Sequence, residues 1–106
     1  MTNERFNEIV NELQNNTNKV LLKKKDEYNL TDDRLDVFNG AAARQKRTVP
    51  QAVLGYMDKH IGSIYDYVLA DRKMTKELAQ EKIGDALNYL YLLYAALEEN
   101  GFAVKK

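Results

Sequence analysis

Acidic and amide side chains recur on one face of the most apolar segment of the chain, EKIGDALNYLYLLYAAL at residues 81–97. Because a helix turns about 100° per residue, Glu81, Asp85 and Asn88 fall within an arc of about 60°. Two carboxylates four residues apart can hold one divalent cation, and Mg²⁺ would complete its shell with water and phosphate oxygens. We therefore predict Glu81 and Asp85 as Mg²⁺ ligands and Asn88 as a ligand-binding residue.

A second polar stripe with the same spacing consists of Lys59, Ser63 and Asp66. We assign these three residues and His60 to the candidate ligand-binding site. For His60, the simpler alternative is a partly buried hydrogen-bonding residue. A Ser-His-Asp triad is rejected, because these residues are neighbours on one helix and lack the strained turn and oxyanion loop of such enzymes.

Each stripe is expected to lie opposite an apolar face that forms the core. The predicted core residues are Met57, Ile61, Ile64 and Val68 in one segment and Ile83, Leu87, Leu90, Tyr94 and Leu97 in the other. In the simplest alternative, both stripes are solvated outer faces. However, residues 86–97 are apolar all round, which indicates burial on more than one side and predicts a homo-oligomer. The stripe would then lie at the mouth of a subunit interface, a favourable place for a ligand.

Arginine side chains are candidates for contacts to an anionic ligand, because the guanidinium group binds phosphate in a bidentate manner. The candidates are Arg34, Arg44, Arg47 and Arg72. The alternative for the run RQKR at residues 44–47 is positive charge that complements the C-terminal end of a helix.

Helical periodicity is strong along the whole chain and strand signals are scarce, so four helices are expected to position these residues. The predicted elements are a helix at 3–28, a short helix capped by Thr31, Asp32 or Asp33 and ending in ARQKR, a helix capped by Thr48 with Pro50 in its first turn, and a helix from Thr75 to about Asn100. The predicted fold is all-α: residues 1–106 form a single domain, a helical bundle of three long helices and one short helix.

Composition excludes several classes of function. The formal net charge is zero, which argues against general nucleic-acid binding. The chain has no cysteine and one histidine, so disulfides and cysteine-zinc sites are excluded. The start MTNERFNEIV lacks a signal-peptide hydrophobic region, and the longest apolar run is too short to span a bilayer. A cytoplasmic protein with no membrane partner is expected.

Four blocks that cover most of the chain carry a family resemblance: KKKDEYN (23–29), DRLDVFNGAA (33–42), GYMDKHIGSIYD (55–66) and EKIGDALNYLYLL (81–93). Together they resemble small proteins encoded by phages of Gram-positive bacteria, related in pattern to the phage nucleotide-modification-associated domain family. The last block is more distantly similar to the metal-binding helix of all-α nucleoside triphosphate pyrophosphatases of the MazG and dimeric dUTPase type. The resemblance implies a helical oligomer that binds nucleotides with Mg²⁺, in the host cytosol if the protein is phage-encoded.

The catalytic pattern of those pyrophosphatases uses two helical carboxylate pairs, each normally three residues apart. Here Glu81 and Asp85 are four apart, and Lys59 stands where the second pair would be expected. We therefore favour a non-catalytic phage accessory protein that sequesters a nucleotide-derived anion, such as a host immune signal, in the manner of an anti-defence sponge. The first alternative is a Mg²⁺-dependent MazG-like nucleotide pyrophosphohydrolase in which Glu81, Asp85 and Asp66 hold the metal. The second is a structural oligomerisation module.

Overall fold

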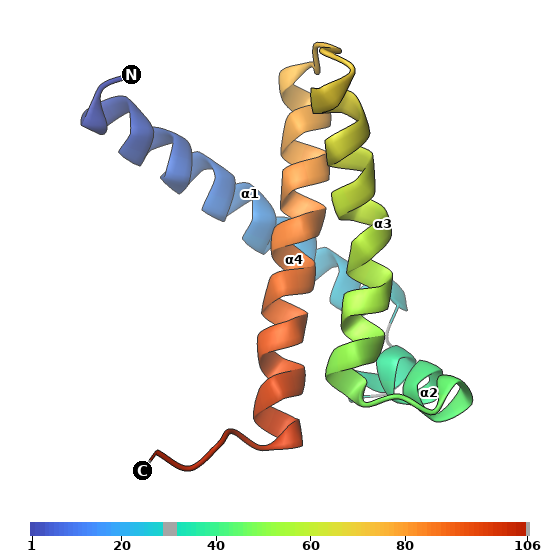
Figure 1. The fold of residues 1–106 in the computed structure, drawn as a ribbon. Helices are drawn as coiled ribbons and strands as arrows, with labels where there is room; N and C mark the ends of the chain where they lie inside the picture. Colours follow the sequence, from blue (N-terminus) through green and yellow to red (C-terminus); the bar gives the residue numbers. More distant parts are fainter. Residues whose placement is uncertain (29–31, 106) are drawn as a thin grey trace.

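The described part of the chain forms four α-helices: α1 (Asn3–Tyr28), α2 (Asp36–Gln45), α3 (Val49–Leu69) and α4 (Lys76–Asn100). This computed structural model describes residues 1–28 and 32–105, and the side chains of residues 1–21 and 32–105. Figure 1 shows α3 and α4 as an antiparallel pair, with α2 packed at the start of α3 and α1 crossing α4 obliquely. Among the described residues no strand occurs, so the predicted all-α fold of three long helices and one short helix is confirmed.

The starts of α3 and α4 lie where their capping residues predict them. The Thr48 hydroxyl accepts a hydrogen bond from the Gln51 amide at 3.3 Å, and the Gln51 side chain accepts one from the Thr48 amide at 3.0 Å. Pro50 occupies the first turn of α3, where a missing N–H costs little. The Thr75 hydroxyl likewise accepts from the Leu78 amide at 3.1 Å. These side chains satisfy amide groups that have no partner within their helices.

The start of α2 differs from the prediction. Thr31 lies outside the described residues, and Leu35 occupies the N-cap position without a side-chain hydrogen bond. The Asp33 carboxylate instead accepts hydrogen bonds from the Leu35 amide and from the Asn39 side chain, both at 2.9 Å. The prediction that an acidic residue caps α2 is therefore wrong. Asp33 instead stabilises the turn that precedes the helix.

The core of the chain is small and lies where α2, α3 and the end of α4 meet. Its main cluster contains Leu35, Phe38, Val53 and Ala96, and Tyr89, Leu92, Leu93 and Val49 pack against it. The radius of gyration is 16.0 Å, whereas a compact domain of this length has about 13 Å. Much of the apolar surface is consequently not covered by the chain itself. No helix in the described part of the chain combines the length and hydropathy needed to cross a bilayer.

The predicted core face of α4 is turned away from the core. Ile83 is 36% exposed, Leu90 49%, Tyr94 64% and Leu97 41%. The face that contacts α3 and α1 instead carries small and polar residues, which include Gly84, Ala96, Asp85 and Asn88. The predicted core face of α4 is therefore wrong, because small side chains allow the neighbouring helices to approach the opposite face closely.

The assignment of faces on α3 is partly correct. Met57, Ile61 and Ile64 are half-buried as expected, whereas Val68 is 65% exposed. The predicted polar stripe is divided: Lys59 and Asp66 are exposed, but Ser63 is half-buried against α4. The face of α3 that contacts α4 is thus rotated toward the polar stripe relative to the prediction.

Candidate functional site

A row of polar and aromatic side chains lies between α3 and α4, and we call it the polar seam. Its members are His60, Ser63 and Tyr67 from α3 and Lys82, Asp85 and Tyr89 from α4. On each helix these residues are three and four positions apart, so each set shares one helical face. Because the two helices are antiparallel, Ser63 and Tyr67 lie near Lys82, whereas His60 lies near Asp85 and Tyr89. We call the first group, which is nearer the turn between α3 and α4, the outer end of the seam, and the second group its inner part.

The inner part of the polar seam is formed by His60, Asp85 and Tyr89. The Nδ1 atom of His60 lies 3.8 Å from the Oδ2 atom of Asp85, which is an electrostatic contact rather than a direct hydrogen bond. The His60 ring lies 4.8 Å from the Tyr89 ring, centroid to centroid, with an interplanar angle of 33°. Both side chains are mostly buried, with 29% of the His60 surface and 20% of the Asp85 surface exposed. This part of the seam links the two helices and has limited access to solvent.

The outer end of the polar seam brings two cations to one aromatic ring. Lys82 Nζ donates a hydrogen bond to the Ser63 hydroxyl and lies 4.8 Å from the centre of the Tyr67 ring. The guanidinium carbon of Arg72 lies 4.1 Å from the same ring, and its Nη2 donates to the Tyr67 hydroxyl at 3.4 Å. Within the described part of the chain, no ion pair joins either cation to a carboxylate. Their charge is therefore available to an anionic ligand.

Asn88 lies beside the polar seam, one turn after Asp85 on α4, and is only 4% exposed. Among the described residues, neither its Nδ2 nor its Oδ1 atom has a hydrogen-bond partner. A buried amide in this state costs about 1–3 kcal/mol for each unsatisfied group. The predicted ligand-binding residue Asn88 is thus inside the protein, and its cost to stability is compatible with a functional role.

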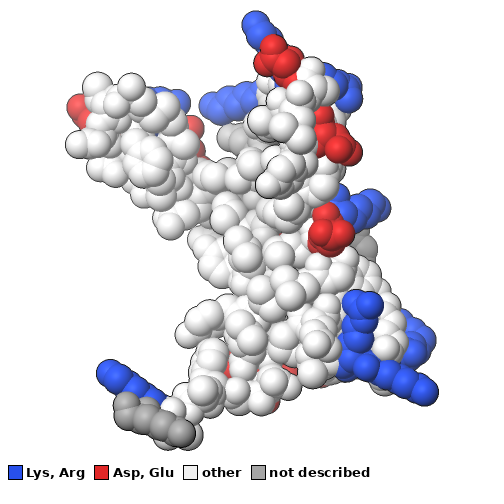
Figure 2. All heavy atoms as spheres, viewed as in Figure 1, with Lys and Arg blue, Asp and Glu red and all other residues white. Residues whose placement is uncertain are grey.

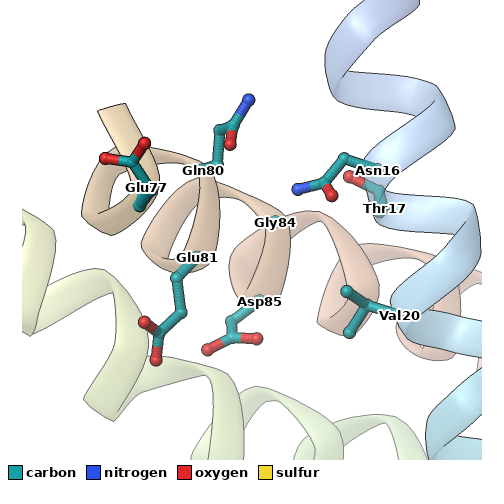
Figure 3. A pocket seen from close by; sticks show the side chains of 8 residues that line it. All are labelled: Asn16, Thr17, Val20, Glu77, Gln80, Glu81, Gly84 and Asp85. Carbon is teal, nitrogen blue, oxygen red and sulfur yellow. The ribbon is translucent and has the colours of Figure 1, made fainter. Parts of the chain in front are cut away.

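The predicted metal ligands Glu81 and Asp85 belong to a hollow between α1 and α4, with a volume of about 310 Å³. In Figure 3 their carboxylates lie side by side and point toward α3, away from Asn16 and Thr17 on α1. Across the described side chains, no group of three His, Cys, Asp or Glu residues is placed to hold a metal ion. The two carboxylates could supply at most a small part of the coordination shell of Mg²⁺, which keeps several waters in such sites.

The remaining predicted ligand-binding residues are spread over the molecule. Arg34 donates from Nη2 to the backbone oxygen of Leu21 at 2.8 Å, so it ties the segment before α2 to α1. Arg44 and Arg47 are exposed, together with Lys46, at the corner between α2 and α3. Lysine and arginine side chains gather over that corner in Figure 2. The structure therefore separates these arginines from the polar seam, and of the four predicted arginines only Arg72 lies at it.

Three residues of the polar seam were not among the predicted site residues: Tyr67, Lys82 and Tyr89. The sequence signal that could have identified them is a shared spacing. His60, Ser63 and Tyr67 are separated by three and four residues, and so are Lys82, Asp85 and Tyr89. This match predicts one contact face on each of two antiparallel helices. It becomes informative only when the two helices are known to be partners.

No protein-family model matches the sequence, and no match was found among curated proteins or solved structures. The described residues form an all-α protein in which two cations, Lys82 and Arg72, meet at one end of a helical hairpin.

Proposed function

We propose that the protein binds a small phosphate-bearing ligand of the nucleotide type at the outer end of the polar seam. The supporting observation is that Lys82 and Arg72 converge on the Tyr67 ring without a carboxylate partner in the described part of the chain. An ammonium and a guanidinium group at one place provide charge-assisted hydrogen bonds to phosphate oxygens. The Ser63 hydroxyl adds a further polar contact, and Tyr67 gives the site an apolar wall.

We propose further that the ligand is held and released without chemical change. Phosphoanhydride hydrolysis by two metal ions needs several carboxylates that clamp the attacking and leaving oxygens. Here Glu81 and Asp85 point toward α3, Asp85 lies beside His60 of that helix, and Asp66 is exposed. The Mg²⁺-dependent pyrophosphohydrolase remains the alternative, and the paired carboxylates are the observation that favours it.

In the cell, this proposal describes a homo-oligomeric accessory protein that sequesters a nucleotide-derived anion. The exposed apolar face of α4 supports the oligomer, because a monomer in water would leave that face uncovered. The phage setting and the role as an anti-defence sponge rest on the sequence resemblance alone. The basic corner of Arg44 and Arg47 is a separate surface and is not part of the proposed site.

Isothermal titration calorimetry with ATP, dGTP, cyclic dinucleotides and inorganic phosphate tests the proposal. We expect one of the nucleotides to bind, and Lys82→Ala to weaken its binding about 10- to 100-fold through loss of a charge-assisted hydrogen bond of about 1.5–3 kcal/mol. Lys19→Ala is the matched control, because Lys19 is exposed on α1 and lies outside the polar seam. Chromatography of the nucleotide after incubation with Mg²⁺ should recover it intact.

Two other results separate the alternatives. Mg²⁺-dependent cleavage that is lost in Glu81→Gln would establish the pyrophosphohydrolase instead. Binding that is unchanged in Lys82→Ala, or absent for every nucleotide in the panel, would remove the ligand site at the polar seam. In the second case the structural oligomerisation module would be the remaining function.

A further inference from the structure

The exposed side of α4 carries a row of large apolar side chains that we call the outer ridge: Ile83, Leu90, Tyr94 and Leu97. Between 36% and 64% of each side chain is exposed. Leu90, Tyr94 and Leu97 are three or four residues apart, and Ile83 lies seven residues, or two turns, before Leu90, so all four form one strip along the helix opposite the polar seam. Phe102 extends the strip, since its ring lies 5.7 Å from that of Tyr94.

Beside the first half of α4 lies an apolar groove that we call the wedge. Figure 1 shows the N-terminal half of α1 diverging from α4. A hollow of about 340 Å³ lies between the two helices, with Ile9, Leu13, Ala79 and Ile83 in its lining. Charged residues at its rim are Arg5 and Glu12 on α1 and Lys76 at the start of α4, whose Nζ lies 4.0 Å from the Glu12 carboxylate. The wedge and the second half of the outer ridge therefore lie at opposite ends of the same helix.

Few charged side chains lie on this face of the molecule. In Figure 2 the surface from the crossing of α1 and α4 down along α4 is almost entirely uncharged, and most Lys, Arg, Asp and Glu side chains lie at the margins. On α1, Arg5 is paired with Glu8 at 2.9 Å and with Glu12 at 3.4 Å. Hydrogen bonds to Glu8 and to Glu12 raise the pKa of Arg5 above its ordinary value. These pairs neutralise charge within α1 and leave the neighbouring apolar side chains as the main feature of this surface.

We infer that a second copy of this chain covers the outer ridge, with the α4 helices of the two copies antiparallel about a two-fold axis near Leu87. In this arrangement Leu90, Tyr94 and Leu97 of each copy enter the wedge of its partner. One surface thus supplies both the ridge and the groove, which is the condition for a closed, isologous dimer. This inference deepens the proposed function, because it names the surface through which the proposed homo-oligomer forms.

Charge at the two ends of the outer ridge selects the antiparallel direction. Lys76 lies at the start of α4 and Glu98 near its end, and Leu87 is midway between them. An antiparallel pair places Lys76 opposite the partner's Glu98 at both ends of the interface. A parallel pair would place lysine against lysine and glutamate against glutamate, which is unfavourable.

The exposed apolar area is sufficient for a specific interface. The outer ridge and Phe6, which is 56% exposed on α1, present on the order of 500 Å² of surface, at the upper end of what a monomer shows to water. A standard interface buries about 800 Å² on each partner, including its polar rim. The ridge would therefore supply the apolar centre of such an interface, and the wedge and the flanking charged residues would have to supply the rest of its area.

Sedimentation velocity of the full chain tests the interface. We expect a dimer for the natural sequence and a monomer for Leu90→Glu at about 50 µM, since a charge cannot be buried in an apolar groove without a partner. Leu54→Glu is the matched control, because Leu54 on α3 is 47% exposed against 49% for Leu90 and lies outside the ridge and the wedge. Far-ultraviolet circular dichroism should show equal helix content in all three proteins. A monomeric natural sequence, or dissociation by Leu54→Glu but not by Leu90→Glu, would overturn the inference.

The direction of the pair is tested separately with single cysteines, for which the chain is suited because it contains none. A short bis-maleimide should cross-link Leu87→Cys into a dimer. It should not cross-link Tyr94→Cys, because the antiparallel register separates the two copies of that position by about 21 Å along the helices. Efficient cross-linking of Tyr94→Cys would show a parallel pair. Lys76→Glu should weaken the dimer, and the double variant Lys76→Glu with Glu98→Lys should restore it.

Failure of the interface and failure of the ligand site give different results. A natural chain that is monomeric but binds a nucleotide would overturn the interface alone. A natural chain that is dimeric but binds no nucleotide would overturn the ligand proposal alone.

Discussion

His60 on α3 and Asp85 on α4 face each other inside the helical hairpin, with the Nδ1 atom of one 3.8 Å from the Oδ2 atom of the other. This contact places Asp85, one of the two predicted metal ligands, beside a residue of the predicted anion site. Across α3 and α4, the first predicted polar stripe is therefore in contact, through Asp85, with the predicted ligand-binding residue His60. A substitution in one stripe should consequently affect both the packing of the hairpin and the chemistry of the site.

Asp85→Asn removes the negative charge from this contact at nearly constant shape. We expect the free energy of unfolding to fall by about 1 kcal/mol, because the pair is mostly buried but is not a direct hydrogen bond. Chemical denaturation followed by circular dichroism measures this change. Asp58→Asn, on an exposed residue of α3, is the control and should leave stability unchanged within about 0.5 kcal/mol.

Two results would contradict this account of Asp85. A loss of more than about 3 kcal/mol would indicate a fully buried charge network. No loss at all would place the carboxylate on a solvated face.

Asn88→Leu replaces a buried amide, which has no hydrogen-bond partner among the described residues, by an apolar side chain of similar size. We expect it to stabilise the fold by about 1 kcal/mol, which raises Tm by about 4–8 °C in a domain of this length. If Asn88 contacts the ligand, the same substitution should lower nucleotide affinity, so stability and binding would change in opposite directions. Differential scanning calorimetry gives the first quantity and titration calorimetry the second.

Asn88→Ala is the companion variant, because it removes the amide but leaves a cavity. It should be less stable than Asn88→Leu. A destabilised Asn88→Leu protein would show that the amide is hydrogen-bonded in solution, contrary to its state in the structure.

Gly84 on α4 is buried and lies close to Thr17 of α1. A Cβ atom added there would lie 3.8 Å from the Thr17 hydroxyl, which is ordinary van der Waals contact. Gly84→Ala should therefore stabilise α4 by about 0.5–1 kcal/mol through helix propensity, whereas Gly84→Leu should push α1 away and lower Tm. At Gly62 on α3 no atom lies within 4 Å of an added Cβ, so Gly62→Ala and Gly62→Leu should both be tolerated. Equal Tm values for Gly84→Leu and Gly62→Leu would contradict the close approach.

Mg²⁺ should change the thermal stability of the protein only when a nucleotide is also present. Glu81 and Asp85 alone give the ion two carboxylates, and phosphate oxygens would have to complete the shell. Thermal melts with Mg²⁺, with nucleotide and with both should therefore show a shift beyond the nucleotide effect only in the last case. Glu81→Gln should abolish that extra shift. A large shift with Mg²⁺ alone would reveal a more complete metal site than two carboxylates provide.

The sequence by itself determined where the helices lie. Thr48 and Thr75 cap α3 and α4 as predicted, and Leu35, Phe38, Ala41 and Ala42 form the buried face of α2. These features depend on residues close in sequence, because a cap bonds an amide two or three residues away and a helical face repeats every three or four residues. The shared spacing of the two polar stripes is likewise a local property.

The tertiary structure alone decided which face of α4 lies inside. The large side chains of Leu90 and Tyr94 predict a core face, yet this face is exposed, and Gly84 and Ala96 lie against the neighbouring helices. Periodicity shows that a helix has an apolar face but does not show whether the chain itself or a second copy covers it. It also does not show which helices become neighbours, so the meeting of Lys82 and Arg72 at Tyr67 was not predicted. Both features depend on contacts between distant segments, which are set by how closely the helix backbones can approach one another.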